Sequence, residues 1–437
     1  MDFKKIYEIY SIISTGIVTN SKKARKGSIF IAFKGKKLDG NKFVSEAILN
    51  GAILAIMDNK KYFSTSCNKM ILVNNTLHFL QKLAIYHRYK NNHIPIIAIV
   101  GSNGKTTTKE LLHKIFAKKY KNVHSTKKNY NNHIGVPLTI LSMPKKTQIS
   151  VIEIGANHEK EIEKMCRIVN PDYGYITNFG KAHLEGFHDF IGIIRSKLEL
   201  YKYLENSNKL AFVNGDDTIQ LSNCINLKKF IFSSEKININ PDVKFKYLWN
   251  YKGLKSVLLI GNTKIISPLI GDYNLYNMAA SVTIGIYFKI SINIIKKAIE
   301  EYIPKNYRSQ IFEKKDKKII VDCYNANPTS MIKALRFFNN NIEGRKAIIL
   351  GDMLELGRFS NEEHEKIISF VEKSNIEIAF LIGNNFFYTK KNYTKIKKFL
   401  NVKMFADCVL KHPIKSVDFI LIKGSRKIKL EKIIYLI

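Results

Sequence analysis

The stretch IAIVGSNGKTTTKELL, residues 97–112, is an apolar run that stops at a glycine and gives way to a helix-like pattern. Its glycines let the backbone curl so that several N–H groups point inward, and the following helix presents its positive N-terminus to an anion. A lysine and a threonine hydroxyl follow, suited to terminal phosphates and to Mg²⁺. The stretch therefore predicts a nucleoside triphosphate site at Gly101, Ser102, Asn103, Gly104, Lys105, Thr106 and Thr107.

The match to the general phosphate-loop pattern G-x-x-x-x-G-K-[ST] is incomplete, because Ile99 stands where that pattern has its first glycine. A glycine-rich turn with an exposed lysine is the alternative. A phosphate loop alone also leaves the reaction open.

The composition indicates a globular protein of more than one domain. The chain has 437 residues, of which 45% are hydrophobic, and this length favours two or three domains. Its five cysteines are scattered and form no C-x-x-C pair, which is typical of a reducing compartment. No signal-peptide pattern is found, and the longest apolar runs are only strand-sized. We expect a cytoplasmic protein without membrane insertion.

The formal net charge is +35, which raises the possibility of a nucleic-acid partner. The lysines, however, are spread along the whole chain rather than gathered with aromatic residues in one stripe. We therefore expect a solvated basic surface and no nucleic-acid partner. An ATP-driven nucleic-acid-binding protein stays as the remote alternative.

Apolar strands alternate with helical patterns along the chain, and most of them stop at Gly, Asn or Asp. This alternation predicts an α/β protein with parallel sheets and functional loops at the carboxyl ends of the strands. We expect three domains: a small α/β unit at 1–92, a central nucleotide-binding domain at 93–307 and a third, Rossmann-like α/β domain at 308–437. The expected strands lie within 28–35, 52–58, 94–100, 149–155, 173–180, 209–217, 317–328, 346–353, 377–384 and 417–425.

Several motifs occur in the order found in the Mur ligases, the ATP-dependent amide-forming enzymes of peptidoglycan synthesis, and the chain resembles that family over essentially its whole length. The central domain carries GSNGKTTTKE (101–110), NYNNHIGVPLTIL (129–141), EIGANHEKEI (153–162), ITNFGKAHLEGF (176–187), SKLELY (196–201) and GDYNLYNMAAS (271–281). Val100 departs from the family, which usually has Thr there. The resemblance implies a P-loop-type central domain between two other α/β domains.

The C-terminal motifs DCYNANPTSM (322–331), LGDMLELG (350–357) and IKGSRKIKLE (422–431) resemble those of the last ligase of the series. This resemblance implies ATP-dependent joining of D-alanyl-D-alanine to the terminal carboxylate of UDP-N-acetylmuramoyl-tripeptide, through an acyl phosphate, by a monomeric enzyme. The alternatives are the ligase that adds the third residue, a folylpolyglutamate-type ligase, or a non-catalytic relative.

The resemblance also assigns roles in the ATP and metal site. It implies that Lys105, Lys197 and Arg308 are catalytic, that Asn274 and Asp322 contact the nucleotide together with Arg308, and that Lys197 is carbamylated. Its implied Mg²⁺ ligands are Thr106, Glu153, His183 and the Lys197 carbamate. The residues alone support Glu153 best, because a carboxylate at the end of an apolar strand needs a cation or a polar partner.

The remaining assignments concern the two other substrates. The resemblance implies that Ser21, Asn131, Asn132, Asn325 and Asn327 bind substrate. We expect the LGDMLELG motif and His364 to help form the dipeptide pocket, while Lys423, Ser425 and Arg426 offer cationic and hydroxyl donors suited to a carboxylate. The triplet Asn20-Ser21-Lys22 departs from the family's Asp-Ser-Arg, and Lys cannot replace Arg as a bidentate donor. Alternatives drawn from the residues alone are an Asx turn at Asp322, a helix cap at Asn277 and a surface lysine at Lys197.

Overall fold

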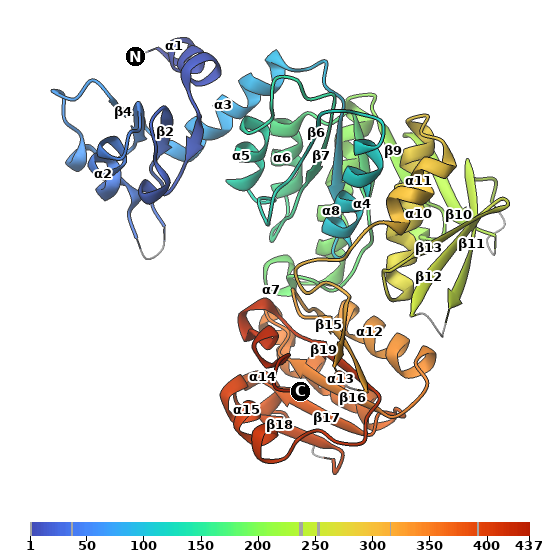
Figure 1. The fold of residues 1–437 in the computed structure, drawn as a ribbon. Coiled ribbons are helices and arrows are strands. Elements are labelled where there is room, and N and C mark those ends of the chain that lie inside the picture. The colour runs from blue at the N-terminus through green and yellow to red at the C-terminus, as the bar shows by residue number, and fades with distance from the viewer. Residues whose placement is uncertain (1, 36–37, 236–238, 251–253, 315, 391–392) are drawn as a thin grey trace. The chain divides into compact units, whose positions relative to one another are not determined.

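The computed structural model describes residues 2–35, 38–235, 239–250, 254–314, 316–390 and 393–437. The chain is mixed α/β, and the strands of the described residues lie in sheets of four, nine and six strands (Figure 1). By its contacts it divides into two compact units. The first comprises 1–98, 120–155 and 161–173, and the second 99–119, 156–160 and 174–437.

The first unit contains the four-stranded sheet, in which β1, β2, β3 and β4 follow one another in chain order and pair in parallel. Its apolar core combines side chains of β2 and β3 with those of α2, including Phe30, Met57 and Val44. The helices and strands that begin in this unit are α1 Phe3–Glu8, η1 Ile9–Ile13, β1 Gly16–Val18, η2 Ser21–Lys23, β2 Ser28–Ile31, η3 Gly40–Phe43, α2 Val44–Leu49, β3 Leu54–Met57, η4 Lys60–Tyr62, β4 Met70–Leu72, α3 Thr76–Lys90, β5 Ile96–Val100, β6 Val123–Ser125, α5 Gly135–Leu141, β7 Ile149–Glu153, α6 Glu161–Val169 and β8 Tyr173–Ile176.

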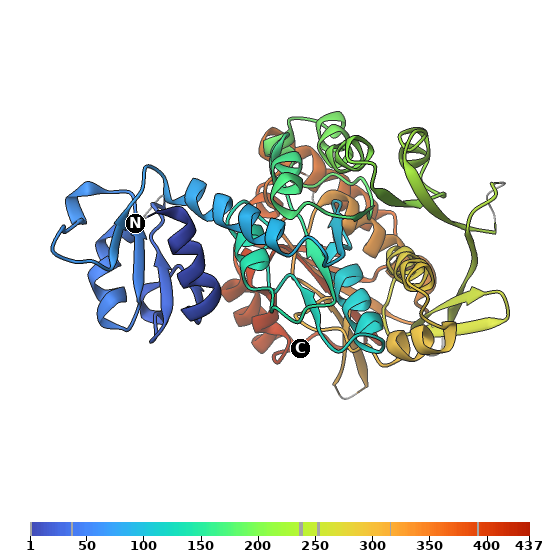
Figure 2. The same cartoon turned by 90° about the horizontal axis from the view of Figure 1, so that it is seen from above.

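Helix α3 packs against α5 and α6 within this unit (Figure 2). Arg88 on α3 is only 1% exposed. Its guanidinium pairs with Asp172 at 3.0 Å and donates to the backbone carbonyls of Asn91, Ile94, Val169 and Asn170. A buried cation is tolerated only when it is paired and hydrogen-bonded in this way. Arg88 thus fixes the end of α3 against the residues that follow α6.

The second unit begins with the residues around the phosphate loop. Strands β9, β10 and β11 pair in parallel, whereas β11, β12 and β13 form an antiparallel meander. The order of the nine-stranded sheet is β13-β12-β11-β10-β9-β8-β5-β7-β6. Helix α10 packs closely on α4, and a Cβ at Gly285 of α10 would lie 3.2 Å from Cγ2 of Ile115 of α4. The elements of this part are α4 Lys105–Ala117, α7 Leu184–Phe187, α8 Phe190–Asn206, β9 Leu210–Asn214, α9 Thr218–Ser222, β10 Lys228–Ser234, β11 Val243–Asn250, β12 Lys255–Ile260, β13 Thr263–Ser267, α10 Asp272–Tyr287 and α11 Ile292–Glu300.

The rest of the second unit is built on the six-stranded sheet, ordered β14-β15-β19-β16-β17-β18, in which only β14 is antiparallel to its neighbour. Every second strand residue, for example Ile319, Ile349 and Ile420, packs with Phe405 of α15 and Leu430 of η7. The elements are β14 Gln310–Lys314, β15 Lys317–Asp322, α12 Pro328–Asn341, β16 Lys346–Gly351, η5 Gly357–Phe359, α13 Ser360–Glu372, β17 Ile378–Ile382, α14 Asn384–Phe387, β18 Ile396–Phe399, α15 Val402–Lys411, β19 Phe419–Lys423, η6 Arg426–Ile428 and η7 Leu430–Ile433.

The expected α/β class is confirmed, and each expected strand segment contains a strand. The apolar segment 28–35 forms a shorter strand than its length indicated, since β2 ends at Ile31. All five cysteines are free thiols. Within the described ranges, no helix combines the length and the apolar character needed to cross a bilayer.

Candidate active site

The phosphate loop lies between β5 and α4, and its two glycines have backbone angles that other residues rarely adopt. Gly101 has φ +137° and Gly104 has φ +84°. A Cβ at Gly101 would lie 1.9 Å from Oγ1 of Thr177, and one at Gly104 would lie 2.3 Å from Oδ1 of Asn277. Both positions therefore require glycine for conformation and for space.

The turn that follows β8 holds the phosphate loop in place. Oγ1 of Thr177 donates to the carbonyl of Asn103 at 2.5 Å, and Nδ2 of Asn178 donates to the same oxygen at 2.9 Å. Oδ1 of Asn178 accepts the Asn103 N–H, and the Ser102 hydroxyl donates to the Gly180 carbonyl at 2.8 Å. These bonds leave the loop with a defined curl before any ligand binds.

Lys105 is the first residue of α4, and its ammonium folds back over the loop. Nζ donates to the carbonyl oxygens of Gly101 at 2.5 Å and Ser102 at 3.2 Å. Thr106 and Thr107 follow in the first turn of this 13-residue helix. A helix N-terminus and a lysine held beside a glycine-rich loop form an anion site, and a phosphate can take over the ammonium from the loop carbonyls.

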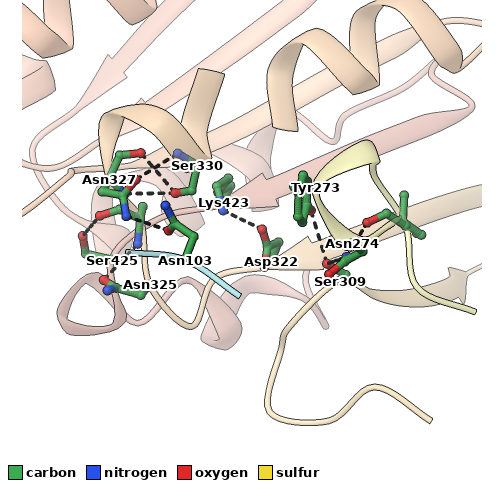
Figure 3. A network of polar contacts seen from close by, with 12 residues as sticks. Asn103, Tyr273, Asn274, Ser309, Asp322, Asn325, Asn327, Ser330, Lys423 and Ser425 are labelled. Carbon is green, nitrogen blue, oxygen red and sulfur yellow. Dashed lines mark hydrogen bonds and ion pairs between the residues drawn. The ribbon is translucent and has the colours of Figure 1, made fainter. Parts of the chain in front are cut away.

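A chain of amides connects α4 to the residues before β14. The Thr108 hydroxyl donates to Oδ1 of Asn277 at 3.3 Å, and Nδ2 of Asn277 donates to Oδ1 of Asn274 at 3.0 Å. Nδ2 of Asn274 donates to the Ile270 carbonyl and contacts the hydroxyl of Ser309 at 3.4 Å (Figure 3). Asn274 is only 2% exposed, so its amide is engaged inside the protein in this structure.

The other two residues predicted to contact the nucleotide, Arg308 and Asp322, each pair with a side chain of the C-terminal region. The Arg308 guanidinium stacks 3.6 Å from the ring centroid of Tyr324. Asp322, at the end of β15, pairs through Oδ2 with Nζ of Lys423 at 2.5 Å (Figure 3). Lys423 is itself buried, with its side chain 3% exposed. The structure therefore brings Asp322 and Lys423 together as one ion pair.

Asn327 joins the C-terminal sheet region to the phosphate loop. Its Oδ1 accepts the Ser330 N–H in a capping box that begins α12, with Pro328 at the first helical position. Its Nδ2 donates to Oδ1 of Asn103 at 2.7 Å (Figure 3). Asn325 is exposed, and its Oδ1 accepts the neighbouring Ala326 N–H at 2.9 Å.

His183 and Lys197 lie on the elements after β8. Nδ1 of His183 is 2.5 Å from Oε2 of Glu355, and the hydrogen bond from this imidazole lowers the pKa of the Glu355 carboxyl. Lys197 on α8 is 3% exposed, with Nζ 4.7 Å from the ring centroid of Phe187. Burial separates Lys197 from the ordinary surface lysine that was the alternative.

His364 lies in the core of the C-terminal region rather than on a surface, with no exposed area. Nδ1 donates to the Ser360 carbonyl at 2.6 Å, and Nε2 accepts the Met353 N–H at 3.1 Å. Burial lowers the pKa of His364, which agrees with a neutral ring that accepts at Nε2. His364 therefore holds the 350–357 motif in shape through the backbone at Met353.

The first unit carries the remaining predicted residues. Nδ2 of Asn131 donates to Oε1 of Glu153 at 2.8 Å, and Glu153 is 3% exposed at the end of β7. Oδ1 of Asn132 accepts the Gly135 N–H at 2.8 Å at the start of α5. The hydroxyl of Ser21 donates to Oε2 of Glu46 at 2.8 Å. In this unit the structure thus brings Asn131 and Glu153 together.

The donor chemistry of these residues fits a magnesium ion. Among the described residues, no group of three or more His, Cys, Asp or Glu side chains could enclose a metal. Mg²⁺ does not need such a cage, because it binds one or two carboxylates and keeps its waters and substrate phosphates. The carboxylate of Glu153, the hydroxyl of Thr106 and the imidazole of His183 are each a donor type that can bind such an ion.

Three contributors were not singled out from the sequence: Thr177, Asn178 and Glu355. All three lie inside quoted motifs, ITNFGKAHLEGF and LGDMLELG. The polar positions of Thr177 and Asn178 directly after β8 were the available signal for these two, whereas Glu355 lies four residues beyond the end of β16 and had no such signal. Their partners lie roughly 75 to 170 positions away in the chain, at Asn103 and His183.

Three family models match the chain: the catalytic domain of the Mur ligase family at residues 14–88, the Mur ligase middle domain at 99–285 and the Mur ligase glutamate ligase domain at 307–426. Curated relatives named UDP-N-acetylmuramoyl-tripeptide–D-alanyl-D-alanine ligase include one from Buchnera aphidicola subsp. Baizongia pistaciae, 34% identical over 98% of this chain and 93% of the relative. Another, from Bacillus subtilis, is 31% identical over 96% of this chain and 92% of the relative.

Two solved structures have a similar fold over nearly the whole chain. MurF from Acinetobacter baumannii superposes with a TM-score of 0.84 at 28% identity, covering 96% of this chain and 92% of that one. MurF ligase from Thermotoga maritima in complex with ADP gives a TM-score of 0.84 at 27% identity, covering 98% of this chain and 97% of that one.

Proposed function

The chain belongs to the Mur ligase family, and from this premise we propose that it joins D-alanyl-D-alanine to the terminal carboxylate of a UDP-N-acetylmuramoyl-tripeptide, with cleavage of ATP to ADP and phosphate. The observation that carries the proposal is the phosphate loop, whose curl is held by Thr177 and Asn178 and whose Lys105 ammonium lies over two loop carbonyls. This loop accounts for the ATP-dependent half of the reaction.

The chemistry has two steps. A peptide carboxylate oxygen attacks the γ-phosphorus of ATP, the bond from that phosphorus to the bridging oxygen breaks, and ADP leaves. The amine of D-alanyl-D-alanine then attacks the acyl carbon of the mixed anhydride and loses a proton, and inorganic phosphate departs with the original carboxylate oxygen. Lys105 and Arg308 supply positive charge where the phosphoryl group is transferred.

Magnesium and a modified lysine complete the proposed site. Glu153, Thr106 and His183 would hold Mg²⁺, which supplies charge neutralisation for the transferred phosphoryl group when bound. Lys197 would carry a carbamate, an anion that assists the metal site. Its burial beside Phe187 supports this assignment, because a lysine without a special role is rarely buried to this extent.

The division of labour along the chain is proposed from the same premise. We assign 1–92 to the UDP-sugar, 93–307 to ATP and 308–437 to the dipeptide. We propose that Ser21, Asn131 and Asn132 bind the muramyl substrate, and that Asn325 and Asn327 bind substrate from the C-terminal domain. Asn274 and Asp322 are proposed near the nucleotide. In this structure Asn274 is hydrogen-bonded to Asn277, and Asp322 is paired with Lys423. We propose that each side chain contacts the nucleotide while it keeps this partner.

The surroundings of the enzyme follow from its substrates. We propose that the enzyme is cytoplasmic, because its nucleotide substrates and its five free thiols suit a reducing, ATP-containing compartment. We also propose that it acts as a monomer. We propose that the basic surface has no nucleic-acid partner.

Release of ADP across a panel of substrates tests the proposed function. We expect ADP only when a UDP-muramyl tripeptide and D-alanyl-D-alanine are both present, and a Lys105→Met variant serves as the inactive control. A preference for UDP-muramyl dipeptide with a free amino acid would assign the third-residue ligase instead. Stimulation by nucleic acid alone would favour the remote alternative.

A further inference from the structure

Two residues in the left-handed backbone region face each other across the second unit. His183 has φ +56° and Glu355 has φ +64°, although neither is a glycine. Such conformations are unfavourable for residues with a Cβ, and they persist where the surrounding structure requires them. The structure around both turns therefore holds these two residues in place.

Both the side chains and the backbones of the two turns are in contact. Oε2 of Glu355 lies 2.5 Å from Nδ1 of His183, and the carbonyl of Glu355 accepts the Glu185 N–H at 3.2 Å. A Cβ at Gly357 would come within 3.3 Å of Cα of Glu185. The turn of the LGDMLELG motif is thus fitted against the short helix α7, which begins directly after His183.

The hydrogen bond determines which nitrogen of the imidazole can bind a metal. A carboxylate that accepts from Nδ1–H places the lone pair of the neutral ring on Nε2. No partner for Nε2 is found among the described residues, and the His183 side chain is 29% exposed. Metal-binding histidines commonly have such a carboxylate on their other nitrogen, which fixes the tautomer and the ring orientation.

We propose that Glu355 is a positioning residue for the metal site: it holds His183 as the Nδ1–H tautomer and directs Nε2 toward the divalent cation. This inference rests on the proposed function, in which His183 is a metal ligand. It gives the ELG part of the C-terminal motif a role in the phosphoryl-transfer site in addition to any role toward the dipeptide. In this proposal Glu355 acts through His183 and contacts neither the cation nor ATP.

Nitrogen NMR of the metal-free protein tests the tautomer directly. With ¹⁵N-labelled histidine, we expect the Nδ1–H tautomer of His183 to predominate. A His183→Gln variant identifies its signals. In Glu355→Leu the Nδ1–H form should lose its predominance, whereas Glu355→Gln, whose amide oxygen still accepts, should retain it. A His183 tautomer that is the same in wild type and Glu355→Leu would overturn the inference.

Binding of Mn²⁺ with ADP, followed by electron paramagnetic resonance of the free ion, provides the second readout. Loss of the carboxylate should weaken Mn²⁺ binding by about 10- to 100-fold. Glu355→Gly serves as a second variant, because it removes the carboxylate while glycine suits φ +64°. Glu362→Gln is the matched control, since Glu362 is an exposed residue of α13 that pairs only with Lys366 among the described residues.

The outcomes separate this inference from the proposed function. Equal Mn²⁺ affinity in Glu355→Gly and Glu362→Gln would overturn the role of Glu355. If wild type bound no Mn²⁺ in the presence of ADP, the metal site of the proposed function would be wrong. The tautomer measurement needs no metal, so it decides the positioning role in either case.

Discussion

Replacement of Gly104 by alanine would test how the phosphate loop is held. The new Cβ would lie 2.3 Å from Oδ1 of Asn277 and 3.0 Å from its Cγ and Nδ2, well inside the 3.4 Å at which ordinary contact begins. Overpacking of this kind costs about 1–3 kcal/mol. The left-handed backbone at φ +84° adds about 1–2 kcal/mol for a residue with a Cβ. We therefore expect Gly104→Ala to destabilise the loop and the start of α4 by about 2–5 kcal/mol.

A double-mutant cycle separates the two causes. Because the three nearest atoms all belong to Asn277, Asn277→Ala removes the overlap and leaves only the backbone strain. Asn277→Ala has a cost of its own, through lost bonds to Thr108 and Asn274. The double variant should be destabilised by about 1–3 kcal/mol less than the two single changes together, a coupling of about 5- to 150-fold.

Native-state hydrogen exchange of the α4 amides measures this coupling. The Thr108 N–H donates to the Gly104 carbonyl at 2.9 Å, so its protection reports directly on the loop. Exchange gives a local opening free energy for each amide and does not require the whole chain to unfold at once. Additive losses in the double variant, or unchanged protection in Gly104→Ala, would refute the assigned contact.

Three further predictions concern single side chains. Thr177→Val removes one of two donors to the Asn103 carbonyl, and by calorimetry ADP should bind about 3- to 10-fold more weakly, a loss of about 1 kcal/mol; unchanged affinity would contradict the role of this turn. Lys197→Ala should lose ligase activity and regain part of it with short-chain carboxylic acids in the ADP-release assay, and full activity without them would exclude the proposed carbamate. Burial lowers the pKa of His87 from 6.5 to about 4, so as the pH falls below 6.5 the unfolded chain takes up a proton that the folded chain does not. In urea unfolding, the free energy of unfolding should therefore fall by about 2 kcal/mol more between pH 7 and 5 in wild type than in His87→Phe. Equal falls in the two proteins would contradict the buried neutral ring.

The strands and the phosphate loop could be predicted because their signals are local. An apolar run that ends at Gly101, with a lysine four residues later, specifies a strand, a turn and a helix within a few positions. The antiparallel strands β11 to β13 were not among the expected strands. Their signal was present in the alternation of VKFKYL, residues 243–248, which is typical of a strand with one exposed face.

Which polar groups a protein uses internally could not be predicted in this way. Asn274 and Asp322 were assigned to the nucleotide, and the structure pairs them with Asn277 and Lys423. Asn41 is similarly buried, and its amide donates to carboxylates of Asp39 and Asp58. An amide or carboxylate after a strand has the same sequence signal whether its partner is a ligand or another side chain.

The role of Glu355 could not be predicted either, because its partner His183 is distant in the chain. The motif LGDMLELG contains two carboxylates, and nothing in their spacing distinguishes Asp352 from Glu355. In the structure, Asp352 accepts the N–H groups of Asn385 and Phe386 at the start of α14, whereas Glu355 meets His183. Tertiary packing, rather than residue type, gives the first a structural role and the second a place beside the proposed metal ligand.

Oxygen-isotope tracing tests most directly whether the peptide carboxylate is activated by the γ-phosphoryl group of ATP. The tripeptide substrate would be labelled with ¹⁸O in its terminal carboxylate and incubated with ATP, D-alanyl-D-alanine and the enzyme. We predict that one labelled oxygen appears in the inorganic phosphate for each amide bond formed. Unlabelled phosphate accompanying product formation would contradict an acyl-phosphate route.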